Sequence, residues 1–454
     1  MGYLVSPSSP PKNYMTRILV SLGFLIGLEA IAAAQGSPSD VSISSFDPED
    51  AVAPVSAVEG RGIKIGEGSV LHPVIGLETG VVSNVFYVPT NTTAAGILRL
   101  LAQVGTASNS GERMQSASAG GDDGPAAAPS TGSFAYSASV RASYDLMLSG
   151  NNTVTGTGGL GLGALLKATV NPAGKVSFGI DENYTRLIRA ANFETDADTN
   201  RDLNILGLNV NFKPDSAFGG YAYYLNTIDV FERSQQQFAD RMENKIGAHP
   251  TWHWLPNTLV FADVSQGIYT GIGGASTKVS SYPFTGVAGI ASLLTLKTTV
   301  NVSAGYTLGN YSTGPSFSGF VASAQFGYRY SPLGRVLAAY DLMYSDSINA
   351  NYYRDHVLRL WLQQFYNPLT FMIQPELHFR EYNGITAVMG PPTRDDVIFS
   401  VVAGVHYNFR SSIAATLDYH YSQVLTNYRY STTGVSTDPS FVRHELLAGI
   451  RVAL

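Results

Sequence analysis

Three histidines lie where a binding or catalytic site could form. His378, His406 and His420 occupy polar positions of segments in which polar and apolar residues alternate, as do Glu376 and Asp418. Imidazole and carboxylate groups brought together can hold a metal ion or act as the base of a hydrolase. Yet no His-Glu-x-x-His or other close ligand pair occurs, and a water-filled interior needs polar side chains in any case. We therefore predict no metal site, no catalytic residue and no enzyme.

Alternating glycines between Gly158 and Gly163 offer a second kind of site. A phosphate-binding loop needs a strand before it, a helix after it, and a following Lys-Ser/Thr pair or acidic partner. These features do not accompany the glycines. We interpret the run as part of a strand or of a loop at its end, and we expect no cofactor.

The other charged residues of the alternating segments form the main candidate site. Eight acids and seven arginines fall on the polar side of the pattern, so neither sign prevails. They could set up a transverse field that screens solutes, or form cross-strand pairs that brace a wall, and both readings stay open. The predicted lumen-lining residues are Glu78, Arg141, Asp145, Asp181, Asp341, Arg359, Glu376, His378, Arg380, His406, Arg410, Asp418, His420, Glu445 and Arg451, with Asp263, Arg329 and Arg443 following the same pattern.

The elements that must position these residues are most evident between Val397 and Leu454. Apolar and polar residues alternate there in three segments separated by two turns. A period of two gives each strand one apolar and one polar face. Long strands of this kind are typical of a transmembrane β-barrel, whose outer face meets lipid and whose inner face meets water.

Composition supports the same fold class. Charged residues make up 14% of the 454 residues, the net charge is -6 and there is no cysteine. Soluble proteins carry roughly 25% charged residues. After the N-terminal segment, no apolar stretch reaches the roughly 18 residues of a spanning helix, so insertion into lipid must use strands closed into a barrel. The mild acidity gives no indication of nucleic-acid binding.

The N-terminal segment has the pattern of a secretory signal peptide. Lys12 and Arg17 precede a short apolar run, and Ala32 and Ala34 have cleavage-site spacing. We predict a signal peptide at 1–34 and a flexible periplasmic leader at 35–68, with Met1 or Met15 as the start. The barrel is predicted at 69–454, with a disordered loop at 107–132.

Short turns and longer loops alternate along the barrel segment, as in outer-membrane barrels. This rhythm predicts eighteen antiparallel strands in an up-and-down barrel. Sixteen is the alternative, because the alternation is poorest around 157–170 and 281–297. An even number places both ends of the barrel chain in the periplasm.

The segment from Pro73 to Phe86 has a proline, an alternating strand, then Gly, Ser-Asn and Phe. It resembles the first strand of a family of outer-membrane β-barrel porins associated with capsular and exopolysaccharide biosynthesis and export. The Asn-Arg-Asp-Leu-Asn run at 200–204 and the turn from Trp252 to Pro256 also resemble that family. The resemblance implies a porin-like barrel without catalytic residues, whose function is polysaccharide export.

The predicted function is therefore conduction through a barrel in the bacterial outer membrane. Polysaccharide export follows from the resemblance, a general diffusion porin is the alternative in the same class, and an outer-membrane lipid or protein hydrolase is the alternative from another class. The expected partners are outer-membrane lipid, lipopolysaccharide, the barrel-assembly machinery and periplasmic polysaccharide-export proteins.

Overall fold

The structure is a computed structural model that describes residues 60–65, 69–108, 133–190, 199–213, 217–234, 236–385, 393–432 and 435–454. The predicted signal peptide at 1–34 lies outside these residues, as do most of the leader and of the loop at 107–132. Those three assignments stay predictions.

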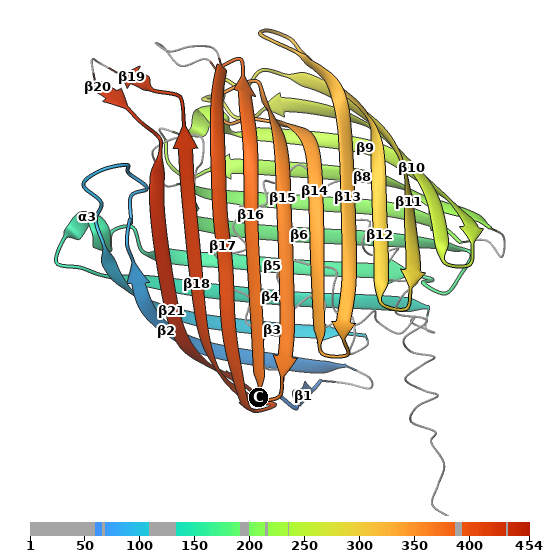
Figure 1. The fold of residues 1–454 in the computed structure, drawn as a ribbon, viewed down its shortest axis with the longest axis horizontal. Helices are drawn as coiled ribbons and strands as arrows, with labels where there is room; N and C mark the ends of the chain where they lie inside the picture. The colour runs from blue at the N-terminus through green and yellow to red at the C-terminus, as the bar shows by residue number, and fades with distance from the viewer. Residues whose placement is uncertain are drawn as a thin grey trace, which may run out of the picture.

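Eighteen antiparallel strands form one closed barrel (Figure 1). Their bounds are β2 (Val70–Val82), β3 (Ala95–Ala107), β4 (Phe134–Leu148), β5 (Gly159–Val170), β6 (Val176–Ala190), β7 (Thr199–Phe212), β8 (Phe218–Phe231), β9 (Arg241–Leu255), β10 (Thr258–Gly271), β11 (Ser281–Thr295), β12 (Thr298–Tyr311), β13 (Phe317–Ser331), β14 (Gly334–Asp346), β15 (Tyr352–Tyr366), β16 (Leu369–Asn383), β17 (Thr393–Arg410), β18 (Ile413–Thr426) and β21 (Phe441–Ala453).

The barrel closes between its first and last strands. Each strand pairs with the next along the chain, β18 pairs with β21, and β21 returns to β2 from Val74↔Ala453 to Val82↔Glu445. The prediction of eighteen strands is confirmed, and the alternative of sixteen is wrong. The two segments of poor alternation form β5 and β11.

A few short elements lie beside the barrel strands. They are β1 (Ile63–Lys64), the helical turns α3 (Asn152–Thr155) and η3 (Gln237–Ala239), and the hairpin of β19 (Tyr430–Thr432) and β20 (Val435–Thr437). No helix in the described part of the chain has both the length and the apolar character needed to cross a membrane. Strand β1 pairs with β2, so residues 63–64, which fall within the predicted leader, lie beside the barrel.

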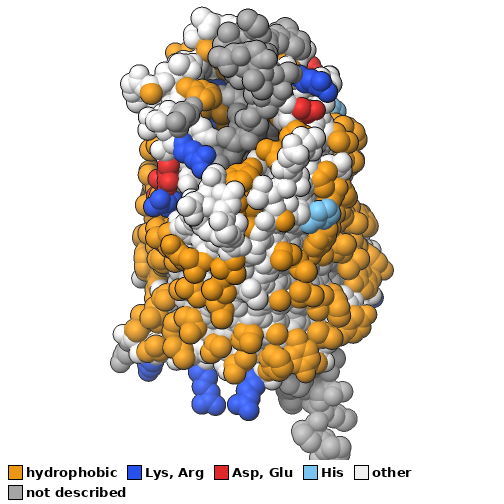
Figure 2. Space-filling view, turned by 90° about the vertical axis from the view of Figure 1, so that its left-hand side faces the viewer, with side chains coloured by type: hydrophobic (Ala, Val, Ile, Leu, Met, Phe, Trp, Pro, Cys, Tyr) orange, Lys and Arg blue, Asp and Glu red, His pale blue; other side chains and the backbone are white. Residues whose placement is uncertain are grey.

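Alternation along each strand separates an outer apolar face from an inner polar one. In β4, Val140 is 59% exposed, whereas Ser143 and Asp145 are each 1% exposed. Hydrophobic side chains cover the outer surface around β2 and β21, with charged side chains near its two ends (Figure 2). Lipid favours such a surface because the paired strands leave no backbone group unsatisfied.

The two ends of the barrel differ in their connections. One end, here called the turn end, carries short turns such as 171–175, in which Asn171 adopts a φ of 57° and its side-chain amide donates to the Val176 carbonyl at 2.8 Å. The opposite end, called the loop end, carries the longer connections, including 83–94, 272–280 and 347–351. The C-terminus and β1 lie at the turn end (Figure 1).

Candidate functional site: the charged inner wall

The inner faces of the strands hold the charged residues that the sequence analysis selected. The strand pairing places all of the following on the face opposite the exposed apolar side chains: Glu78, Arg141, Asp145, Asp181, Asp263, Arg329, Asp341, Arg359, Glu376, His378, Arg380, His406, Arg410, Asp418, His420, Arg443, Glu445 and Arg451. Whether they line an open conduit stays a prediction.

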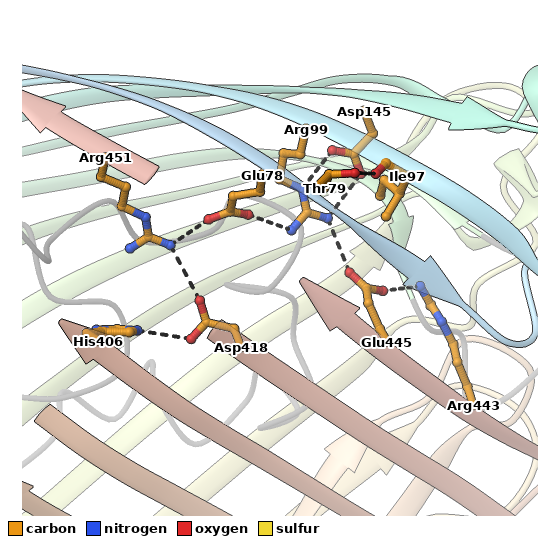
Figure 3. A network of polar contacts seen from close by, with 10 residues as sticks. All are labelled: Glu78, Thr79, Ile97, Arg99, Asp145, His406, Asp418, Arg443, Glu445 and Arg451. Atoms are coloured by element: carbon orange, nitrogen blue, oxygen red, sulfur yellow. Dashed lines mark hydrogen bonds and ion pairs between the residues drawn. The ribbon is translucent and has the colours of Figure 1, made fainter. Parts of the chain in front are cut away.

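The first cluster lies where the barrel closes, across β17, β18, β21, β2, β3 and β4, which we call the seam (Figure 3). At its centre, the Arg99 guanidinium donates to the Asp145 carboxylate at 2.7 and 3.1 Å. The same guanidinium lies 3.4 Å from Glu445 and 3.8 Å from Glu78. Arg99 is 3% exposed, so these charges interact with little screening by water. One cation therefore links four strands, its own β3 and the strands β2, β4 and β21.

Further pairs extend the seam cluster toward the turn end and the loop end. Arg451 Nη2 lies 2.7 Å from Glu78 and 3.8 Å from Asp418, and Asp418 also contacts His406 at 3.0 Å. Arg443 contacts the second oxygen of Glu445 at 2.5 Å. Figure 3 shows these side chains as one connected row across the seam strands. Charged groups at such low exposure need partners of opposite sign, and each arginine and carboxylate of this row contacts one, within its own strand or across to another.

The second cluster crosses β14, β15 and β16. Arg359 donates to Asp341 at 2.9 Å and to Glu376 at 3.1 Å. Its side chain keeps 35% of its accessible surface, compared with 4% for the Arg99 side chain. Arg359 is thus held in place by two carboxylates and still meets the interior of the barrel.

His378 and Arg380 extend this second cluster toward the loop end. His378 contacts Asp355 through Nδ1 at 2.8 Å and Glu376 through Nε2 at 2.9 Å. Arg380 contacts the same Asp355 oxygen at 2.7 Å and lies over the Tyr353 ring, 4.1 Å from its centroid. The shared Asp355 carboxylate and the Tyr353 ring thus fix these two side chains.

The three histidines do not meet in one site, although His378 contacts Glu376 and His406 contacts Asp418. His378 pairs with Ile398, eight residues from His406 along β17, which corresponds to about 26 Å in a strand. His420 pairs with Val402, four residues from His406, or about 13 Å. Within the described ranges, no group of three or more His, Cys, Asp and Glu is placed to hold a metal ion.

The wall from β6 to β10, here called the far wall, carries a third cluster. The Tyr223 hydroxyl donates to one oxygen of Asp263 at 3.0 Å, and His249 Nδ1 contacts the other at 3.1 Å. The His249 ring is stacked between Tyr221 and Phe261, with centroids 4.8 and 5.2 Å apart. Here aromatic packing, a tyrosine hydroxyl and an imidazole hold a carboxylate that the sequence analysis had placed inward.

A segment of the 83–94 connection folds into the barrel at the loop end. Tyr87 packs edge-on against Phe441, with ring centroids 5.1 Å apart, and Arg443 lies 4.5 Å above the Tyr87 ring. Asn84 holds the segment by donating to the carbonyls of Val88 and Val442 at 2.8 and 3.1 Å. The connection therefore covers part of the inner face of β21.

Two more loop-end connections are fastened to each other. The Lys278 ammonium group donates to the carbonyls of Ser347, Ile348 and Ala350, the last at 3.1 Å. The Ala350 side chain packs with Tyr353 and Tyr382 of the inner wall. Three carbonyls satisfy all three N–H groups of the lysine, which anchors the 347–351 connection inside the mouth.

Several members of these clusters were absent from the sequence-based selection. Arg99, Asp355, Asp229, Arg394 and Asp396 all lie on inner faces and all form ion pairs there. The alternation would have found them, since Arg99 stands between Leu98 and Leu100 and so falls on the polar side of its strand. Two of the selected residues contact neighbours on the adjacent strand. Asp181 accepts a hydrogen bond from Asn209 at 3.1 Å. Arg141 lies against Gly163, where an added Cβ would come within 2.6 Å of the Arg141 Nε.

The comparisons with known proteins add the following. No protein-family model and no curated protein matches the sequence. Among solved structures, OccK2 of Pseudomonas aeruginosa, crystallised with glucuronate, is 10% identical, with 86% of this chain and 99% of that chain covered and a TM-score of 0.42. A BenF-like porin from Pseudomonas fluorescens Pf-5 is 11% identical, with 86% and 100% covered and a TM-score of 0.44. The siderophore receptor PirA of Pseudomonas aeruginosa is 7% identical, with 85% and 80% covered and a TM-score of 0.39. With TM-scores below 0.5, these likenesses carry no argument here.

Proposed function

We propose that this protein is a channel of the bacterial outer membrane that passes small polar solutes through its lumen. The observation that carries the proposal is an eighteen-strand closed barrel with an apolar outer face and charged residues along its inner face. Eight strands already fill their interior with side chains, whereas roughly 16–18 strands leave an aqueous channel. The outer-membrane location, the signal peptide and the expected lipid, lipopolysaccharide and assembly partners belong to the same proposal.

The inner wall supports selection among solutes by charge. Arg359 keeps about a third of its side-chain surface accessible and is flanked by Asp341 and Glu376. The inward segments around Tyr87 and Lys278 take up space at the loop end. A solute would pass these segments and then a wall of paired fixed charges, where exposed members act on it more strongly than buried ones.

Two functions within the channel class differ in the solute that is transported: general diffusion of small solutes and export of polysaccharide. A general diffusion porin needs nothing beyond the lumen and its charges, and it fits as well as a specific channel. Polysaccharide export is a prediction that rests on the sequence resemblance alone, and nothing in the comparisons supports it. A hydrolase is the weaker candidate, because the three histidines that suggested it lie far apart along their strands.

Planar-bilayer recording of the purified protein tests the proposal. We expect stepwise conductance, and an altered reversal potential in a KCl gradient when Arg359 is replaced by glutamine. Absence of conductance in a heat-modifiable, folded preparation would contradict the proposal. Lipid hydrolysis without conductance would favour the hydrolase, and a conductance blocked by an acidic polysaccharide but not by small anions would favour export.

A further inference from the structure

The outer surface of the far wall carries polar side chains where a lipid-facing strand should be apolar. Five of them, which we call the amide face, lie on consecutive strands: Glu182 on β6, Asn204 on β7, Asn226 on β8, Asn244 on β9 and Gln266 on β10. The pairing fixes their direction. Glu182 pairs with Leu166 and Leu206, and Asn244 pairs with Ile268, which is 51% exposed.

These side chains lie within the height of the hydrocarbon layer. A strand tilted by about 40° rises about 2.5 Å per residue along the membrane normal. Glu182 stands six residues after Val176, the first residue of β6, and Asn226 stands eight after Phe218, the first of β8. The corresponding heights are about 15 and about 20 Å, within an apolar band about 25 Å tall.

The seam shows what the outer face looks like where lipid covers it. The outward residues of β18 and β21 include Leu417, Tyr419, Leu446 and Ile450, and the polar His444 and Gln423 there contact the hydroxyls of Tyr419 at 2.8 Å and Tyr421 at 3.0 Å. Polar groups in hydrocarbon are costly unless they face protein or water. The amide face therefore indicates contact with protein rather than with lipid.

Hydrogen bonding within the amide face is incomplete. Asn244 Oδ1 accepts from the Tyr224 hydroxyl at 2.7 Å and from Asn226 Nδ2 at 3.0 Å. Its own Nδ2 has no acceptor among the described residues, and neither Glu182 nor Asn204 has any side-chain partner there. The face thus offers a carboxylate that accepts and amides that donate, side by side.

Small residues beneath the amides allow another barrel to come close. Ala222 pairs with Ala248, Ala262 with Ala288, and Ala288 with Ala304, and all lie on the outer face. Small residues at membrane interfaces let two backbones approach each other. These small residues and the unsatisfied polar groups are independent observations on one side of the barrel.

We propose that the amide face is where a second copy of this chain docks, as a two-fold dimer with its axis along the membrane normal. Every copy in a membrane has the same orientation, so residues of equal height meet. An axis through β7 places Asn204 opposite Asn204 of the second copy, and Glu182 beside Asn226 of the second copy with a height difference of about 5 Å, which the Glu182 side chain spans. The carboxylate then accepts from amides, and the polar groups are shielded from lipid. This inference is independent of conduction.

Cysteine cross-linking in native membranes tests the docking. The chain has no cysteine, so single substitutions report without background. We choose Asn204→Cys alone, and Glu182→Cys co-expressed with Asn226→Cys, with Tyr421→Cys as the matched control, since Tyr421 lies eight residues after the first residue of β18 on the seam. Under oxidation or with a short bismaleimide, we expect a band at twice the monomer mass for Asn204→Cys and for the co-expressed pair, and none for the control. No dimer, equal dimer from the control, or an adduct of another mass would overturn the proposal.

A second pair of variants separates a protein interface from a lipid-facing surface. Asn226→Leu together with Asn244→Leu removes the amides without adding charge. We expect at least a tenfold weaker dimer by light scattering in detergent, with the barrel still heat-modifiable and still conducting. If the double variant associates like the wild type and resists heat better, the amide face meets lipid and the proposal is wrong.

Discussion

The seam and the far wall have similar inner faces and different outer faces. Both carry buried carboxylates held by several donors, such as Asp145 at the seam and Asp263 on the far wall. Outside, the seam presents Leu417 and Ile450, whereas the far wall presents Glu182 and Asn226. An inner polar face shows that a strand borders the interior, but only the outer face shows whether lipid or protein covers it.

The largest effect is expected at the centre of the seam. Arg99→Met removes the cation shared by Glu78, Asp145 and Glu445 and leaves buried carboxylates without it. Removing one partner of a buried ion pair costs about 3–5 kcal/mol. Urea unfolding of the refolded barrel measures the loss. Arg359→Met is the control, and equal stability of the two variants would show that the seam is not a special point of closure.

Leu417→Arg should come next, because it places a cation on the lipid-facing side of the seam. The expected cost is about 2–4 kcal/mol near the midplane of the bilayer. Asp418→Asn, one residue away, keeps the shape of the side chain and one oxygen for the His406 contact, and Arg451 stays paired with Glu78, so this variant should fold with nearly the wild-type yield. Asp418→Arg is not a suitable control, since its cation would face Arg451 across the 3.8 Å contact. Normal folding of Leu417→Arg into vesicles would mean that the strand is shifted by one residue.

On the far wall, Tyr223→Phe should have a smaller effect. It removes the hydroxyl that donates to Asp263 at 3.0 Å and leaves the His249 contact in place. A single buried hydrogen bond contributes about 0.5–1.5 kcal/mol. Thermal loss of heat-modifiability measures it, with Tyr330→Phe as the control, because that hydroxyl is 3.4 Å from its acceptor and exposed. A loss of stability as large as that of Arg99→Met would show that the far wall and the seam depend equally on their buried polar contacts.

The smallest effect on stability is expected for Arg359→Gln. The Arg359 side chain is about a third exposed, so its pairs with Asp341 and Glu376 contribute about 0–1 kcal/mol. Its effect on conduction should be clear, because one positive charge is lost beside two negative ones. We expect the reversal potential to move toward cation selectivity. An unchanged reversal potential in a conducting variant would show that permeant ions do not pass this part of the wall.

Much of the fold followed from alternation and turn rhythm. The eighteen strands, and the inner side for residues such as Glu78 and Arg451, need only local pattern, because a strand alternates with a period of two. The pairing of Glu78 with Arg451 could not be predicted in the same way, since 373 residues separate them. Which inward residues touch depends on the stagger between strands. This stagger places the three histidines at different heights, so they do not contact one another.

The sequence pattern also could not predict the inward segments of the loop end. Tyr87 has a φ of 54°, and its place against Phe441 and Arg443 depends on a connection with no alternation to read. Lys278 binds carbonyl groups of another connection, and backbone acceptors leave no signature in a sequence. The alternation alone, in contrast, is enough to place the amide face, because Asn226 and Gln266 fall among the outward residues of their strands, where an apolar residue is expected.

The closing of the barrel by its first and last strands has a consequence for biogenesis. Glu78 and Arg99 enter the membrane early in the chain, and the Arg451 and Glu445 groups that they contact come from the final strand. An incomplete barrel that lacks β21 holds these early charges without those partners. Pairing of β21 with β2 therefore removes uncompensated charge from the open edge of the barrel in the same step that closes it.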